Sequence, residues 1–210
     1  DFYRAPLGAI PTARMVSPDF PELTIGAVAP DGVRVVDALA CRLLGLDATE
    51  LAGIEGGARA SLELRRQEFG QWVSSLEGRT AVIADDGVAS GLTMRAAILW
   101  ARARGARTVV AVAPVALQSA IAPLRRLADD VAFVLTPREL GRVGLWYDDF
   151  EEVPDGVVNA ALTGQRTAAG DGKSQRPVIE ALTLNTAEGA LDADLALPPA
   201  AKAVVLFAHG

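Results

Sequence analysis

The sequence is poor in cysteine and in positive charge. It has a single cysteine, Cys41, and 20 Lys and Arg residues against 26 Asp and Glu. One thiol excludes an internal disulfide and a zinc site built from several thiolates, and it is more often a buried structural thiol than a nucleophile. The net charge of −6 argues against a nucleic-acid-binding surface. A single loop and helix end can still bind a phosphate locally.

Long hydrophobic runs are also missing. The longest apolar stretches, such as "TVVAVAPVAL" at 108–117, contain proline and fall well short of the ~20 residues that cross a bilayer. At 210 residues and 50% hydrophobic, the chain can nevertheless bury a full core. We therefore expect a globular, cytoplasmic protein with no membrane partner.

No G-x-G-x-x-G or G-x-S-x-G motif is present, which argues against a nicotinamide dinucleotide site and a hydrolase serine.

The apolar patterns alternate between strand and helix along the first two thirds of the chain. A capping box at 47–50 opens one helix, and two more are expected at 92–104 and 117–128. The expected strands lie at 23–28, 33–36, 81–85, 108–115 and 130–135. This order predicts an α/β fold with a mainly parallel sheet flanked by helices.

The last fifty residues change in character. Residues 162–177, rich in Gly, Ser, Thr and charge, have no apolar period and are interpreted as a linker after a first domain at 1–161. A second unit is expected at 178–210, where the sequence alternates around "AEGA" like a hairpin and ends in the buried-strand run "AKAVVLFAHG".

The stretch "AVIADDGVASGLT" at 81–93 carries the clearest chemical signal. Two adjacent acids, Asp85 and Asp86, follow an apolar strand and precede a loop of small residues, in which Gly87 and Gly91 permit a positive φ. The loop leads into a helix with one apolar face, formed by Leu92, Ala96, Leu99, Trp100 and Ala103. In an open α/β sheet, ligands bind beyond the carboxyl ends of the strands, where a helix amino terminus offers N–H groups to an anion. The acids only accept hydrogen bonds, so they suit vicinal hydroxyls or the waters of a magnesium ion. A sugar phosphate satisfies both the acids and the loop.

These thirteen residues resemble the phosphoribosyl pyrophosphate (PRPP) motif of type I phosphoribosyltransferases. The resemblance implies that Asp85 and Asp86 are the catalytic pair that holds the ribose 2′- and 3′-hydroxyls. It also implies that the loop surrounds the 5′-phosphate with backbone amides and two hydroxyls. Ser90 stands where threonine is usual, and Leu92 where a smaller residue is common. The implied PRPP-binding set beyond the two acids is Gly87, Val88, Ala89, Ser90, Gly91, Leu92 and Thr93.

Two further stretches carry the resemblance, which covers roughly residues 5–160. "ARMVSPDFPELTIGAV" is similar to a pattern of one bacterial subgroup, with Arg14 in the place of a lysine, which makes Arg14 a candidate for pyrophosphate binding. "VGLWYDDF" at 143–150 resembles the subgroup's hood, where Trp146 or Tyr147 would stack on the acceptor.

The subgroup is often fused to a dienelactone hydrolase-like domain, and 178–210 resembles its opening strands. The family's first βα unit has no counterpart in the chain.

Simpler interpretations stay open for each of these residues. The acidic pair could be a helix cap and its neighbour. Trp146 and Tyr147 could pack on the domain, and Arg14 could be a surface residue. A helix that is expected to be solvated carries three arginines, Arg59, Arg65 and Arg66. The less common alternative for them is a role in a loop over the pyrophosphate.

The resemblance implies an enzyme that transfers the phosphoribosyl group of PRPP to a nitrogenous acceptor and releases pyrophosphate. Magnesium would arrive with PRPP, without a direct protein ligand. The alternative is a non-catalytic PRPP- or nucleotide-binding regulatory module attached to an α/β-hydrolase domain. The expected partners are small molecules, and the chain is also compatible with a homo-oligomer.

Overall fold

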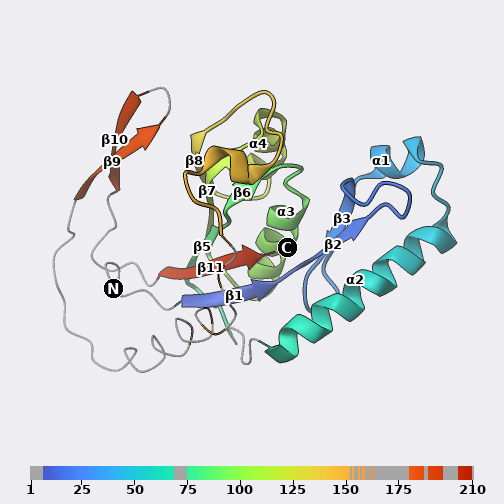
Figure 1. Cartoon of the computed structure of the whole chain (residues 1–210). Helices are drawn as coiled ribbons and strands as arrows, with labels where there is room; N and C mark the ends of the chain where they lie inside the picture. Colours follow the sequence, from blue (N-terminus) through green and yellow to red (C-terminus); the bar gives the residue numbers. More distant parts are fainter. Residues whose placement is uncertain are drawn as a thin grey trace.

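The computed structural model describes residues 7–68, 75–151, 153, 156, 158, 162, 180–186, 189–195 and 203–209. Within them, a larger parallel sheet and a smaller antiparallel sheet lie on either side of one helix, α3 (Leu92–Ala103) (Figure 1). The predicted linker at 162–177 lies outside the described residues except for residue 162. That boundary therefore stays a prediction.

The larger sheet has six strands in the order β1-β11-β5-β7-β6, and β8 pairs with the other edge of β7. All of these pairs are parallel. The central strand reads "TVVAVAPVA", the near-continuous apolar run that a strand covered on both faces requires. The strands are β1 (Leu7–Pro11), β5 (Thr80–Ala84), β6 (Gly87–Val88), β7 (Thr108–Ala116), β8 (Asp130–Leu135) and β11 (Ala203–His209).

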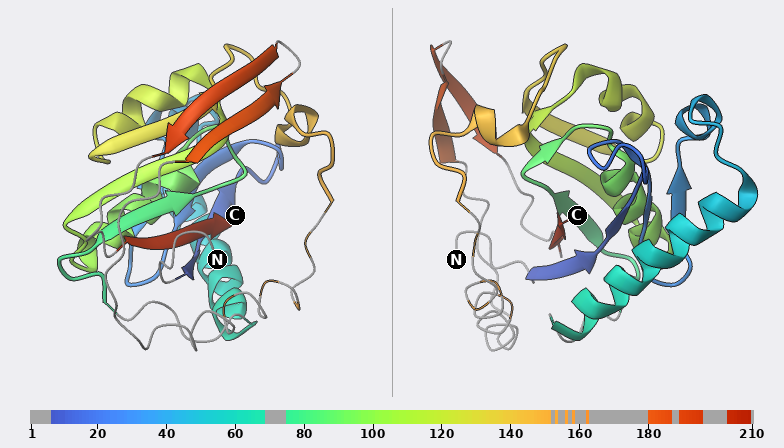
Figure 2. Two further views of the ribbon diagram at one scale, coloured as in Figure 1. Left: turned by 90° about the vertical axis from the view of Figure 1, so that its left-hand side faces the viewer. Right: turned by 45° about the vertical axis from the view of Figure 1, so that its right-hand side comes forward.

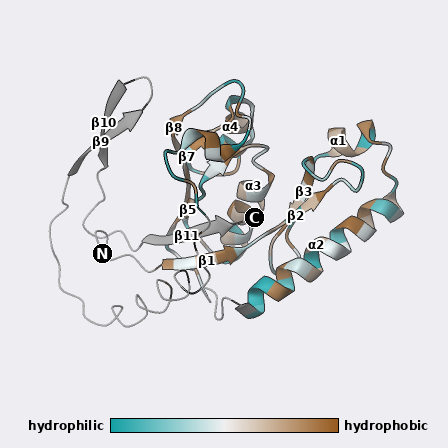
Figure 3. Ribbon diagram, in the orientation of Figure 1, coloured by the Kyte–Doolittle hydropathy of each residue, from teal (hydrophilic) through white to brown (hydrophobic). Residues whose placement is uncertain are grey.

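The smaller sheet is antiparallel and has its own core. Its strands β2 (Ala13–Val16), β3 (Thr24–Val28) and β4 (Arg34–Val36) pair in that order, and α1 (Ala38–Leu43) and α2 (Ala48–Glu68) pack against it. Along α2, hydrophobic and hydrophilic residues alternate, as suits a helix with one buried side (Figure 3). The fully buried members of this core are Met15, Ile25 and Val28, joined by Cys41.

Cys41 is buried in this second core, as expected for a structural thiol. Burial, followed by the charge of Asp37, raises the pKa of the Cys41 thiol. A raised pKa reduces the thiolate fraction at neutral pH, and the thiolate is the reactive form. The geometry therefore favours the structural role over the nucleophile.

Helix α3 is buried between the two sheets. It contacts β5, β7 and β11 of the larger sheet and β3 and β4 of the smaller one. The sequence predicts a single apolar face for this helix. The structure instead buries α3 on more than one side. Leu99, which was expected on the buried face, is 36% exposed. Small residues make the second contact possible, because Ala96, Ala97 and Ala101 are all fully buried. The largest buried side chain of the helix is Trp100.

A polar junction fixes the far end of α3 to the smaller sheet. Trp100 Nε1 donates to Asp31 Oδ2 at 3.0 Å, and Arg104 forms an ion pair with the same carboxylate at 2.6 Å. The guanidinium of Arg104 also lies 5.4 Å from the centre of the Trp100 ring. Asp31 sits in the β3–β4 turn with a φ of 58°, a left-handed conformation that Asp and Asn tolerate better than most residues.

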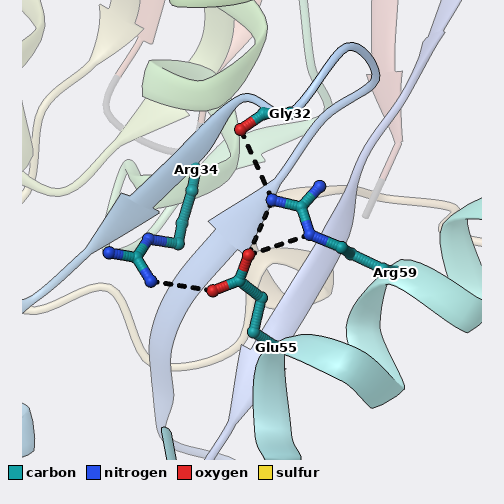
Figure 4. Close-up of polar contacts among 4 residues, drawn as sticks. All are labelled: Gly32, Arg34, Glu55 and Arg59. Carbon is teal, nitrogen blue, oxygen red and sulfur yellow. Dashed lines mark hydrogen bonds and ion pairs between the residues drawn. The ribbon is translucent and has the colours of Figure 1, made fainter. Parts of the chain in front are cut away.

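A second polar cluster joins α2 to the same turn (Figure 4). Glu55 accepts from Arg34 of β4 at 2.8 Å and from Arg59 at 2.7 Å, while Arg59 also donates to the Gly32 carbonyl at 3.4 Å. The hydrogen bond from Arg34 is the main cause of a lowered pKa of Glu55. Arg59 is therefore a structural cation in this turn, the commoner of the two roles expected for it.

The sequence predictions agree with most elements of the first domain. The capping box is confirmed, because Asp47 N donates to Glu50 Oε2 at 2.8 Å and Glu50 N donates to Asp47 Oδ1 at 2.8 Å. The predicted strands and helices recur with ends shifted by one to three residues, including α4 (Gln118–Arg125). The sequence patterns missed α1, a six-residue helix capped by Asp37.

The carboxyl-terminal strands are arranged differently from the expectation. The predicted hairpin is present as β9 (Glu180–Thr186) and β10 (Gly189–Leu195), which form an antiparallel sheet of their own (Figure 2). By contrast, β11 lies within the larger sheet, between β1 and β5. The reason is that an apolar run such as "AVVLFAH" indicates a buried strand without indicating which sheet it joins.

None of the helices in the described part of the chain is both long and apolar enough to cross a membrane.

The Asp31 junction yields a stability prediction. Asp31→Ala should lower the free energy of unfolding by about 1–3 kcal/mol, because the buried indole N–H of Trp100 loses its acceptor. Asparagine keeps a carbonyl acceptor and tolerates the same left-handed backbone conformation. Asp31→Asn should therefore lower the free energy of unfolding clearly less than Asp31→Ala. Urea unfolding of both variants measures the difference. Equal losses would mean that the ion pair with Arg104, and not the indole contact, carries the effect.

Candidate functional site

The acidic pair occupies a break between two short strands on one edge of β7. Strand β5 ends at Ala84, and β6 resumes the pairing with β7 at Gly87. Asp85 keeps its backbone N–H bonded to the Val112 carbonyl at 3.1 Å, and Asp86 N donates to Asp85 Oδ1 at 3.0 Å. Both acids are thus held at the carboxyl end of the sheet, as the sequence predicted.

Burial and mutual repulsion set the charge of the pair. Asp85 is partly buried while Asp86 is exposed. Desolvation, followed by the charge of Asp86, raises the pKa of Asp85 to about 8. At neutral pH the pair therefore holds a proton, and Asp85 can donate one hydrogen bond as well as accept others.

The loop after the acids leads into α3 through Gly91. Gly91 is the N-cap of α3 and has a φ of 73°, and a Cβ there would lie 3.3 Å from Ala120 Cβ. The helix cap interpretation of the acidic pair is therefore wrong, because the cap lies six and five residues beyond the two acids. Gly91 has no side chain with which to cap α3, and Ser90 Oγ accepts from Leu92 N, the first N–H of the helix, at 3.4 Å. The next N–H groups of the first turn have no side-chain cap, so an anion can accept from them. Ser90 is exposed and Thr93 partly buried beside them.

Gly87 is required for a reason that differs from the predicted one. It was expected to supply a positive φ, but it does not adopt one. Instead, a Cβ at Gly87 would lie 2.5 Å from Val143 Cγ1. Glycine at this position lets the 143–150 segment pack directly on the acidic turn.

One pocket of about 470 Å³ joins most of the predicted site residues. It is lined by both acids, by Gly87 to Gly91, by Thr93, and by Arg14 from β2. Leu92, Trp146 and Tyr147 do not line it. The sequence analysis missed six lining residues, which are Thr24, Met94, Arg142, Val143, Gly144 and Phe150.

The 143–150 segment forms one wall of this pocket. It begins with a short 3₁₀ helix, η1 (Val143–Trp146), shown in Figure 2. The Tyr147 hydroxyl donates to the backbone carbonyl of Asp86, and the Tyr147 ring lies 5.0 Å from that of Phe150. Burial and the nearby acids raise the pKa of Tyr147, so its hydroxyl stays a donor. Trp146 Nε1 donates to the Leu140 carbonyl at 2.9 Å.

Two arginines line the pocket and take part in none of the ion pairs found among the described residues. Arg14 projects from β2, whose neighbouring residues Ala13 and Met15 are buried, and Arg142 immediately precedes η1. Both side chains are exposed. No cluster of three or more His, Cys, Asp and Glu side chains that could hold a metal ion occurs among the described residues.

The sequence of the chain is similar to sequences of known proteins. No protein family model matches the chain. Two Mycobacterium tuberculosis proteins, one from each of two strains and each named a putative phosphoribosyl transferase, are 33% identical over 99% of the chain. These similarities support a phosphoribosyltransferase-like family for the chain. The chain spans 48% of the length of each of these proteins.

A solved structure shares the fold of the chain. The crystal structure of TT1426 from Thermus thermophilus is 31% identical, with a TM-score of 0.56 over 74% of each chain. The α/β architecture with a parallel sheet flanked by helices is consistent with this family.

The raised pKa of Asp85 predicts a specific dependence of stability on pH. Between the ordinary value of 3.8 and about 8, the folded protein keeps a proton that the unfolded chain releases. Stability therefore falls as pH rises through this window, by at most about 1.4 kcal/mol per pH unit. Asp85→Asn removes this dependence. The melting temperature of the variant minus that of the wild type should therefore increase from pH 5 to pH 8. Asp130→Asn, at the opposite end of the sheet, is the matched control. Parallel melting curves for the Asp85→Asn variant and the wild type would contradict the assignment.

The contact of Gly87 with Val143 predicts a rescue. Gly87→Ala should destabilise the protein by about 1–3 kcal/mol through overpacking against Val143. Val143→Ala in the same chain should restore part of that loss. Gly53→Ala is the control, because open space surrounds Gly53 in α2 and alanine there should stabilise by roughly 0.5–1 kcal/mol. A Gly87→Ala variant as stable as the wild type would show that the wall is not packed on this turn.

Proposed function

We propose that this chain binds PRPP and transfers its phosphoribosyl group to a nitrogenous acceptor, with release of pyrophosphate. The observation that carries the proposal is the pocket, where an acidic pair and an uncapped helix start lie side by side. Carboxylates suit sugar hydroxyls, and helix N–H groups suit a phosphate. A ligand with both groups a few bonds apart is a sugar phosphate.

In this proposal, Asp85 and Asp86 receive the ribose 2′- and 3′-hydroxyls. The segment from Val88 to Thr93 surrounds the 5′-phosphate with its amides, and Ser90 and Thr93 add hydroxyl donors. Arg14 is suited to the pyrophosphate, because it reaches the same pocket from β2. A guanidinium can donate two parallel hydrogen bonds to a phosphate group.

Magnesium enters as part of the substrate. Among the described residues, the acids that line the pocket are Asp85 and Asp86, and two carboxyl groups of which one is protonated make a poor cage for a divalent ion. The same pair can still accept from waters that a magnesium–pyrophosphate group carries.

The reaction is a displacement at ribose C1. The bond from C1 to the pyrophosphate oxygen breaks, and its electron pair leaves with pyrophosphate. The acceptor nitrogen supplies the pair for the new bond to C1, and its proton is lost to solvent or to a base. Positive charge develops on the ring between these events, and the nearby carboxylate of Asp86 stabilises it. The remaining contribution of the protein is to hold both reactants in line.

A binding module without turnover is the second candidate. It rests on the same pocket, because the acidic pair and the start of α3 would bind PRPP whether or not an acceptor reacts. In the fusion that the sequence resemblance implies, such a module would regulate a hydrolase-like unit. Pyrophosphate release in the presence of a panel of bases separates the two candidates, because a binding module releases none.

The acidic pair provides the test of ligand identity. Asp86→Asn should weaken PRPP binding by roughly 10- to 100-fold, because it loses a charge-assisted hydrogen bond of about 1.5–3 kcal/mol. Asp85 is protonated at neutral pH, so Asp85→Asn should weaken PRPP binding less, by roughly 3- to 10-fold, through the loss of a neutral hydrogen bond of about 0.5–1.5 kcal/mol. Inorganic phosphate needs only the loop, so it should bind equally well to both variants, or slightly better to Asp86→Asn, where a nearby negative charge is removed. Titration calorimetry with magnesium–PRPP and with phosphate measures both.

Asp130→Asn is the control for a lost surface charge, since Asp130 lies at the start of β8, away from the acids. Unchanged PRPP affinity in both site variants, with the fold intact by circular dichroism, would overturn the phosphoribosyl assignment.

A further inference from the structure

Four large apolar side chains are exposed around α1 and the loop that joins β2 to β3. This apolar patch consists of Phe20, Leu23, Leu39 and Leu43. Leu43 is 78% exposed, the largest exposed fraction of any large hydrophobic residue in the described part of the chain. Single exposed apolar residues are common on soluble proteins, whereas a group of them marks an interaction site.

The loop and the helix of this patch adjoin where the pairing of β3 with β4 ends. Asp37 N donates to the Ile25 carbonyl at 2.8 Å, so the chain enters α1 beside the start of β3. Leu23 precedes Ile25 by two residues, and Leu39 follows Asp37 by two. Figure 1 shows α1 beside the β2–β3 loop, and α1 contacts β3. The four side chains therefore belong to one surface.

The loop holds its part of the patch in place before any partner binds. Ser17 N donates to the Leu23 carbonyl at 3.0 Å, and Leu23 N donates to the Phe20 carbonyl at 2.8 Å. Proline rings fix φ on both sides of the phenylalanine, at Pro18 and Pro21. A surface that is ordered in this way loses little conformational entropy on association.

Helix α1 is apolar on two sides and covered on one of them. Cys41 is buried in the second core, and Leu44, which follows the helix, packs against that core. Leu39 and Leu43, one turn apart, are exposed instead. A helix that is apolar on all sides is normally buried on all sides. Within the described part of the chain, nothing covers this second side of α1.

Three charged residues border the apolar patch. Asp19 and Glu22 lie on either side of Phe20 in the loop, and Arg42 precedes Leu43 in α1. All three charged side chains are exposed, and none takes part in the ion pairs found among the described residues. The border thus carries negative charge on the loop and positive charge on the helix, without pairing them inside the chain.

We propose that the apolar patch is the interface of a homodimer, in which a two-fold axis sets Arg42 of each copy against Asp19 and Glu22 of the other. A two-fold interface must be complementary to itself. A border with acids on one element and a cation on another meets that condition, because the half turn brings each element to the other. A border of one sign would suit an oppositely charged partner protein instead.

The dimer is independent of the proposed function. No residue of the apolar patch or of its charged border lines the pocket that contains the acidic pair. Binding of magnesium–PRPP and dimerisation can therefore succeed or fail separately.

Sedimentation velocity of the full chain tests the interface. The wild type should change from monomer to dimer between about 1 and 100 µM, as a micromolar dissociation constant requires. Leu43→Asp should stay monomeric throughout, because it places an unpaired charge in an apolar contact. Leu64→Asp is the matched control, since Leu64 is 63% exposed on α2 and lies outside the patch. That variant should dimerise like the wild type.

Charge reversal tests the pairing across the two-fold axis. Arg42→Glu sets three acids together, and the double variant Asp19→Arg with Glu22→Arg sets three cations together. Each change should weaken the dimer by about 100-fold or more. A one-to-one mixture of the two variant chains should form a heterodimer about as tight as the wild-type dimer, because every contact between unlike chains again joins opposite charges. Circular dichroism verifies the fold of each variant.

Three outcomes would overturn the proposal. A wild-type chain that is still monomeric at about 100 µM has no such interface. A dimer that survives Leu43→Asp uses another surface. Two folded charge-reversal variants that stay monomeric when mixed would exclude the two-fold pairing of Arg42 with the acids of the loop.

Discussion

The burial of α3 between two sheets is the constraint on which the site depends. Its alanines allow the parallel sheet to approach from one side and the smaller sheet from the other, while Trp100 and Arg104 fix its far end to Asp31. A helix held in this way cannot shift along its axis without opening both cores. Its first turn is therefore fixed beside the ends of β5 and β7. The amides of the first turn of α3 and the acidic pair keep a constant spacing because they belong to this one packed assembly.

The pocket separates opposite charges instead of pairing them. The two acids lie on one edge of β7, and the two arginines reach the cavity from β2 and from the 142–150 segment without joining the ion pairs of the described residues. Partial burial leaves Asp85 protonated at neutral pH, which limits the repulsion between the acids. This separation of charges is the basis of the sugar-phosphate ligand proposed above. Tyr147 holds the wall to the acidic turn with a hydroxyl that stays protonated.

Local patterns predicted what depends on neighbours in sequence. The capping box of α2, the apolar β5 run and the start of α3 each rest on contacts within a few residues, and each is present. Predictions that needed a distant partner were less complete. Gly87 was expected to need a positive φ, yet its requirement comes from Val143, 56 positions later. Leu99 fitted a helical face but is partly exposed, because the second sheet changes which sides of α3 are covered.

The sequence by itself determined the acidic pair, the small-residue loop and the strand and helix that flank them, because all of these lie within thirteen consecutive residues. It also indicated that the 143–150 segment contributes aromatic residues, without showing which of them faces a ligand. Only the tertiary structure decided that Phe150 and Arg142 line the pocket while Trp146 and Tyr147 bond to backbone carbonyls. It likewise decided that β11 pairs between β1 and β5. The physical reason is the same in both cases: an apolar or aromatic residue signals burial, but the partner that buries it is chosen by chain segments far away in the sequence.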